Sequence, residues 1–455
     1  MTEAGSIAAG LILIIAAGVF NGSWNASFSP KANLAVCNKT LKGKTEHDQD
    51  TVEEPINDLM YHHAFALFQI YAALINIPIC IFWAGGINRV NAIVAEAAKT
   101  PSSIVLIVLF SLLWGVGTLL FGLACKIAGV GLGTNLSMGI IAIIGTFLPL
   151  IVEDSLISAA GGVICIGLFI CCIGLWLSTK AMSMKDEDEC KYAKNEAEEG
   201  EKDLEIVDDK VLDEDEQSSP LVESKNSEGK SESGAASNDI SLRTSTYMHL
   251  RRFTAKFKKS PTSIEQEKKY SSLQKLLICV ATGVCASQLQ FAFVFGQRIT
   301  DLALGVDEAT SSIPGSTHKS GGAAIIWMLA ISLGAPIAIV NGIYSSPVPL
   351  SSAIRAPPSR HLKLIMTTSL PWISHIHIYG VCTTTLLPEK VAASIAWPML
   401  MMITTGQALL LSVFLGEWKV ASKETIRTLK RSIVVTLIGI AILMASVAVP
   451  TKSPV

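Results

Sequence analysis

The chain has 455 residues, of which 50% are hydrophobic and only 16% are charged, and its mean hydropathy is +0.46. A soluble domain of this size carries about 25% charged residues, so this composition excludes an ordinary soluble globular protein. The formal net charge of -2 includes no basic excess that would favour nucleic-acid binding. The sequence therefore predicts an integral membrane protein.

Apolar runs of the length needed to cross a hydrocarbon core, about 20 residues, recur in two groups of five. The first group lies near 5–28, 61–84, 103–125, 131–152 and 156–178, and the second near 273–297, 322–344, 362–382, 390–415 and 430–449. Backbone groups in lipid must be hydrogen-bonded within their own segment, so these runs predict helices. The expected fold class is all-α integral membrane, with ten transmembrane helices as two five-helix inverted repeats.

A polar stretch separates the two groups of spans. Residues 181–271 begin with an acidic stretch from Asp186 to Glu216 and end with a basic one from Arg251 to Lys259. Such a composition buries no core and predicts a disordered linker. We expect three parts: a first five-helix membrane repeat (1–180), a disordered charged cytosolic linker (181–271) and a second five-helix membrane repeat (272–455).

Five helices per half would invert the second half relative to the first, as in transporters built from inverted repeats. Gly18-Val19 and Gly283-Val284 are each followed by polar and aromatic residues, which favours a duplication, although such pairs also recur by chance. Short loops after spans one, three, seven and nine carry more Lys and Arg than the opposite loops, which predicts a cytosolic linker and non-cytosolic termini in a plasma or internal membrane. Thr254 follows Arg251-Arg252 and is a candidate kinase site that would change attraction to membrane lipid.

Polar and aromatic residues inside the spans are the candidates for solute binding. Trp24 and Asn25 end the first span, and an amide beside an indole suits a sugar, although amides also bond between packed helices. Gln290 lies in the sixth span. In the eighth, Trp372, His375 and Tyr379 follow helical spacing, so we assign them with Trp24, Asn25 and Gln290 to substrate binding.

The eighth span contains two histidines, and their spacing separates them. His375 and His377 are two residues apart and point to different faces of a helix, so at most one faces a cavity. We choose His375 because it shares a face with Trp372 and Tyr379; it could bind a hydroxyl or carry a coupling proton. The alternative is a histidine that is satisfied by a neighbouring helix.

Glycines are dense in the third and fourth spans. Gly115, Gly117, Gly139 and Gly145 would let helices approach closely or act as hinges between two conformations.

The stretch from Trp114 to Pro149 resembles the L-rhamnose–proton symporter family of the drug/metabolite transporter superfamily. The matching features are Trp-Gly-x-Gly at Trp114, a basic residue at Lys126 and Gly145-Thr146 before Pro149. In the second half, the spacing of Trp372 and Tyr379, the surroundings of Trp397, and Glu417-Trp418 are also similar. The chain would be a divergent, eukaryotic-type member with a long central linker; His375 stands where the family has glutamine.

This resemblance implies a secondary active transporter of a small polar solute, most simply a rhamnose-like monosaccharide, with possible proton coupling. One alternative is a transporter of another metabolite such as a nucleotide sugar, which would need cationic groups for its phosphates. Another is a channel or membrane receptor, for which rings of charge or filter loops would be expected. No enzyme activity, catalytic residue, metal or cofactor is predicted, and the partners expected are the solute, protons and lipid.

Overall fold

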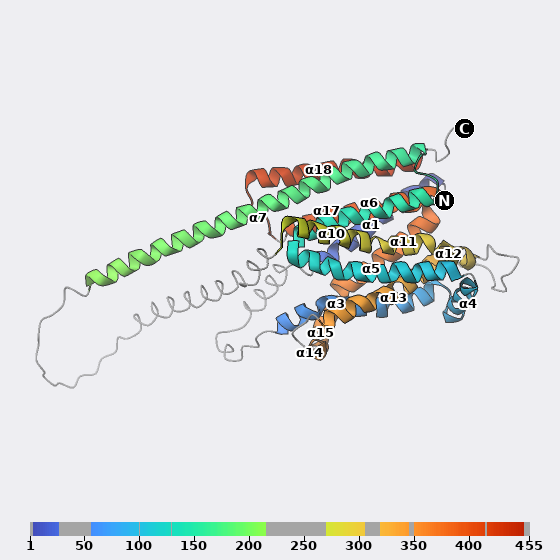
Figure 1. The fold of residues 1–455 in the computed structure, drawn as a ribbon, viewed down its shortest axis with the longest axis horizontal. Coiled ribbons are helices and arrows are strands. Elements are labelled where there is room, and N and C mark those ends of the chain that lie inside the picture. The colour runs from blue at the N-terminus through green and yellow to red at the C-terminus, as the bar shows by residue number, and fades with distance from the viewer. Residues whose placement is uncertain are drawn as a thin grey trace, which may run out of the picture. The chain divides into compact units, whose positions relative to one another are not determined.

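The computed structural model describes residues 3–26, 56–99, 101–128, 130–214, 270–304, 319–344, 350–414 and 416–449. Across these ranges the regular structure is entirely helical (Figure 1). The first half contains α1 (Glu3–Ala26), α3 (Ile56–Trp83), α4 (Ile87–Ala98), α5 (Pro101–Ala128), α6 (Val130–Val152) and α7 (Ala159–Glu214). The second half contains α10 (Ser272–Ala286), α11 (Gln288–Phe295), α12 (Gln297–Leu304), α13 (Lys319–Tyr344), α14 (Leu350–Ile354), α15 (Pro358–Leu364), α16 (Leu370–Val381), α17 (Glu389–Phe414) and α18 (Lys423–Ala445). The expected all-α membrane fold is confirmed.

Nine helical stretches in the described part of the chain are long and apolar enough to cross a membrane. They correspond to nine of the ten expected spans. The run at 362–382 differs, because there the structure has α15, the π-helical segment Ile365–Ser369, α16 and a second π-helical segment, Cys382–Leu386, in succession. The expected count of ten transmembrane helices, and their arrangement as two repeats, therefore stay predictions.

The interruptions on either side of α16 have a local chemical cause. Pro371 has no backbone N–H to continue the helical ladder. Threonine hydroxyls also bond back to carbonyls one turn earlier, from Thr367 to Lys363 and from Thr384 to Gly380. Such back-bonding bends helices, and π segments are common where a helix carries function.

Two other elements differ from the hydropathy-based expectation. The amphipathic helix α4 buries Val90, Ile93 and Ala97 between two spans, where no helix is predicted. The expected span 273–297 is divided at Ser287 and Gly296, and the helical stretch continues as α12 to Leu304. Hydropathy alone misses α4 because only one of its faces is apolar.

Helix α7 continues well beyond the apolar segment of the fifth span. The sequence predicts disorder from residue 181, whereas the structure describes a helix to Glu214. The extension is rich in Glu and Lys, which are strong helix formers, and Glu187 stands four residues before Lys191, the favourable order for such a pair. An apolar helix already formed in the preceding residues removes the cost of nucleation. Residues 215–269, including Thr254, lie outside the described part.

The chain divides into two units, residues 1–185 with 275–455, and residues 186–274. In the first unit α17 packs between α1 and α6, while α13 packs between α3 and α5. Helix α16 contacts α1, α3 and α13, so it lies where helices of both halves meet. Its buried side chains include Trp372, His375, His377 and Tyr379.

Glycine contacts recur in corresponding places in the two halves. A Cβ at Gly18 of α1 would clash with Ile403 of α17, and a Cβ at Gly283 of α10 would clash with Ile140 of α6. In both cases the next neighbour is the carbonyl three residues before the isoleucine.

The pair of α7 and α18, which lie side by side in Figure 1, shows the same reciprocity. Gly167 of α7 lies against Gly439 and Leu443 of α18, and Gly439 lies against Gly167 and Cys171 of α7. On each helix, the second contact is the residue that follows the glycine by four positions. Close approach of this kind requires the absence of a side chain.

Candidate functional site

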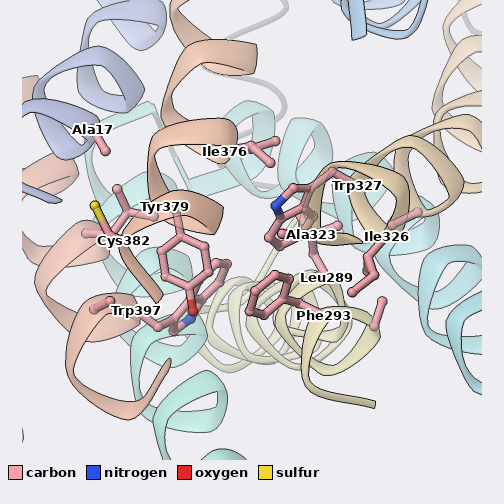
Figure 2. Close-up of a cluster of buried hydrophobic side chains, with 14 of the residues drawn as sticks. Ala17, Leu289, Phe293, Ala323, Ile326, Trp327, Ile376, Tyr379, Cys382 and Trp397 are labelled. Atoms are coloured by element: carbon pink, nitrogen blue, oxygen red, sulfur yellow. The ribbon is translucent and has the colours of Figure 1, made fainter. Parts of the chain in front are cut away.

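The ring of Tyr379 lies at the centre of an aromatic cluster drawn from four helices. Its neighbours are Phe293 of α11 at 5.6 Å between ring centroids, Trp327 of α13 at 6.1 Å and Trp397 of α17 at 5.6 Å. Phe293 and Trp327 stack at 4.7 Å. Figure 2 shows the Tyr379 ring between Phe293 and Trp397, with Leu289 and Ile376 nearby.

Several polar groups in this cluster are buried without a well-formed hydrogen bond in the described part of the chain. They are the hydroxyl of Tyr379, both side-chain amide atoms of Gln290 and the indole Nε1 of Trp327. The three side chains are 1%, 0% and 1% exposed. Tyr379 and Gln290 interact through their side chains, so two predicted residues lie together. Leaving a buried polar group unpaired costs about 1–3 kcal/mol, which a hydroxyl-bearing ligand would offset.

Trp372 and His375 form a second cluster one turn away on α16. The indole of Trp372 stacks on Trp114 of α5 at 5.9 Å and meets Phe68 of α3 edge-on at 5.5 Å. His375 meets Trp372 edge-on at 5.7 Å and interacts with its backbone. Its Nδ1 has no well-formed hydrogen bond among the described residues. Trp372, His375 and Tyr379, which are three and four residues apart, thus lie in two neighbouring clusters: Trp372 and His375 in one, and Tyr379 in the other.

Two predicted binding residues cannot be placed. Trp24 and Asn25 belong to the last turn of α1, but their side chains lie outside the described residues. The helix itself packs against α16 and α17. Their assignment to solute binding stays a prediction.

The four predicted glycines lie at close contacts between helices. A Cβ on Gly115 would clash with the carbonyl of Gly334 in α13, and one on Gly117 with the backbone of Ala286. A Cβ on Gly139 would lie 2.8 Å from Cδ1 of Leu175. A role for these glycines as hinges stays a prediction.

Gly145 is directly connected to the Tyr379 cluster. Any Cβ there would clash with the indole of Trp397. The indole N–H of Trp397 donates to the carbonyl of Ile141 at 3.1 Å, which fixes the ring against α6. Because the same ring contacts Tyr379, the absence of a side chain at residue 145 helps to position the cluster.

The sequence reasoning missed residues that only the packing brings together. Phe293 and Trp327 are not among the predicted binding residues, and a lone aromatic in an apolar span is usually a core residue. His377 was set aside, yet its Nε2 lies 3.0 Å from Oδ1 of Asn76 and its ring stacks on Trp83 at 5.4 Å. A lone amide such as Asn76 inside an apolar run was the available signal.

Comparisons with known proteins bear on the first half of the chain. Residues 96–203, which include α5 and α6, match the L-rhamnose-proton symport protein (RhaT) family. The L-rhamnose-proton symporters of Salmonella paratyphi B (strain ATCC BAA-1250 / SPB7), Salmonella newport (strain SL254) and Salmonella agona (strain SL483) are each 32% identical over 89 residues. That alignment covers 19% of this chain and about a quarter, 26%, of each relative. No solved structure matches the chain.

The family match contains Trp114 and the four predicted glycines, but it ends before α16. The resemblance in the second half therefore stays a prediction. The expected resemblance is confirmed for one segment: residues 96–203 of this all-α, multi-pass membrane chain are similar to the L-rhamnose–proton symporter family.

Proposed function

We propose that the chain is a secondary active transporter of a small, neutral, hydroxyl-rich solute, with a rhamnose-like monosaccharide as the first candidate and protons as the coupling ion. The family match over residues 96–203 supports transport by a sugar symporter-type protein. The observation that carries the proposal is the set of buried polar groups of Gln290, Trp327 and Tyr379 that lack a well-formed hydrogen bond and lie among aromatic rings.

The chemistry of this cluster favours a neutral ligand. An amide, a phenol and an indole N–H supply donors and acceptors for hydroxyls, and the aromatic faces suit the C–H face of a sugar ring. The described segments around Gln290 (288–296), Trp327 (320–344) and Tyr379 (370–386) contain no Lys, Arg, Asp or Glu. A phosphorylated ligand would be expected to meet Arg or Lys, so a nucleotide sugar fits this cluster less well.

In this proposal Trp24, Asn25, Gln290, Trp372, His375 and Tyr379 hold the solute, and the two halves rock around it to open alternately to each side. The corresponding contacts of Gly18 with Ile403 and of Gly283 with Ile140 support a division into two inverted repeats of five helices each. The linker would lie in the cytosol, and both termini on the other side of the membrane.

Uptake by proteoliposomes tests the proposal. Purified full-length protein is reconstituted, and entry of labelled L-rhamnose and a panel of monosaccharides is followed with and without an inward proton gradient. We expect saturable uptake of one sugar, stimulated by the gradient and inhibited by excess unlabelled sugar. Folded, inserted protein that moves none of the panel above the rate of empty liposomes would refute sugar transport.

A further inference from the structure

The second histidine of α16 lies in a polar network that the solute site does not use. Nε2 of His377 lies 3.0 Å from Oδ1 of Asn76 and 3.8 Å from Sγ of Cys80, both on α3. The Cys80 thiol donates to the same Oδ1 at 3.3 Å, and Nδ2 of Asn76 donates to the carbonyl of Trp327 at 3.3 Å. His377 is therefore connected through one amide to the helix that contributes Trp327.

This network fixes which imidazole nitrogen carries the hydrogen. Since Nδ2 of Asn76 is directed to Trp327, its Oδ1 faces His377 as an acceptor, and Nε2 of His377 must be the donor. The neutral ring then has its basic lone pair on Nδ1. A proton can be added at Nδ1 without loss of the bond to Asn76.

The surroundings of His377 differ from those of His375 in ways that favour a cation. Trp83 stacks on His377 with 13° between the ring planes, the geometry of a cation–π contact once the imidazole is charged. Trp83 is 41% exposed and is the last residue of α3, so the stack lies near an end of that helix. His375 has instead the edge contact with Trp372 and lies within the aromatic core.

A proton on His377 would be only partly stabilised in the state described. Helix α16 contacts α1, α3, α13 and the two π-helical segments, and the rings of Trp114, Phe293 and Trp397 bring α5, α11 and α17 against it. Among the residues of these elements with described side chains, Cys80 is the titratable group with a contact to His377; the others are His63, Tyr71, Cys125, Tyr344 and Cys382, and none is Asp, Glu, Lys or Arg. A cation without a nearby carboxylate is costly at membrane depth, which favours its release when the site closes.

We propose that His377 is the residue that binds the coupling proton, and that Asn76 transmits its charge state to the Tyr379 cluster through Trp327. This inference rests on the proposed function. The proton adds to the Nδ1 lone pair from water and leaves later to water on the opposite side, with no change in the oxidation state of any group. Proton and solute would thus bind on two faces of the same helix, α16, which couples their movements.

A test that needs no solute uses the Trp83 stack as a reporter. A protonated imidazole quenches the fluorescence of an indole stacked on it, so we expect emission of the full-length protein to fall on acidification. His377→Gln and Trp83→Phe should each remove the pH-dependent component, while His375→Gln, the matched control two residues away, should keep it. Each variant is first checked for wild-type elution from a size-exclusion column, and Trp83→Phe keeps the test decisive if His377→Gln does not fold.

The proposal is overturned if wild-type protein shows no such quenching, if His377→Gln retains it, or if His375→Gln abolishes it. Uptake then provides the second readout. His377→Gln should lose stimulation by a proton gradient while keeping exchange of solute between equal concentrations on both sides, and His375→Gln should weaken solute binding instead. If wild-type protein moves no sugar, sugar transport fails, yet the fluorescence titration still decides whether His377 binds the proton.

Discussion

The α7–α18 pair and the surroundings of α16 differ in the side chains that fill the space between helices. Between α7 and α18, glycines meet glycines, and the hydroxyl of Ser432 donates to the carbonyl of Gly174 at 2.9 Å. Around α16, large aromatics fill the space, and the polar atoms of Tyr379 and Gln290 remain without well-formed bonds. Satisfied polar groups between small residues are typical of packing, whereas buried unsatisfied ones indicate a place for a ligand.

The largest stability loss is expected in the glycine contact. In Gly439→Ala, the new Cβ would lie 2.8 Å from the backbone nitrogen of Cys171, and overpacking of this kind costs about 1–3 kcal/mol. Thermal unfolding in detergent should show a clear decrease in Tm. Gly162→Ala is the control, because nothing lies within 4 Å of its Cβ and alanine is the better helix former. An equal loss in both variants would contradict the packing role of Gly439.

Gly145→Ala should lower both stability and sugar uptake. The new Cβ would displace the Trp397 indole, which contacts Tyr379. We expect the free energy of unfolding to fall by about 1–3 kcal/mol. Unfolding and uptake are measured on the same preparation. Wild-type values of both would show that Trp397 does not position the cluster.

Tyr379→Phe should separate function from stability. The change removes a buried hydroxyl that lacks a well-formed hydrogen bond, so stability should change little, because the desolvation of that polar group is removed together with its weak interaction with Gln290. Uptake should fall by about tenfold if that hydroxyl bonds the solute, which corresponds to about 1.4 kcal/mol. Initial rates over a range of sugar concentrations provide the test. Unchanged uptake would exclude Tyr379 from the binding site.

The smallest effect is expected where α7 extends beyond its apolar segment. Lys185 lies with its Nζ 5.6 Å from the ring centroid of Trp418, whose indole donates to Ser412 at 2.7 Å. Lys185→Gln should lower stability by about 0.5–1 kcal/mol, the range for an exposed cation–π contact. If the Tm of Lys185→Gln equals that of the wild type at every salt concentration, the contact contributes nothing to stability.

The sequence determined much of the helical architecture, because hydropathy and the requirement for internal backbone bonds leave few alternatives in lipid. Nine of the ten expected spans have a counterpart, and the three-and-four spacing correctly grouped Trp372 and His375, whose rings are in contact. The interaction of Gln290 with Tyr379 joins two further predicted residues. The roles assigned to these residues in binding stay predictions.

Tertiary structure decided which residues meet across helices. Nothing in the local sequence indicates that Trp327 and Phe293 lie beside Tyr379. The local sequence also does not indicate that His377 contacts Asn76 and Trp83. Composition also does not predict that α7 extends to Glu214. A helix propagates from an already formed turn at little cost, so a charged segment can continue it. Periodicity shows which face of a helix a residue occupies, but only packing determines what that face contacts.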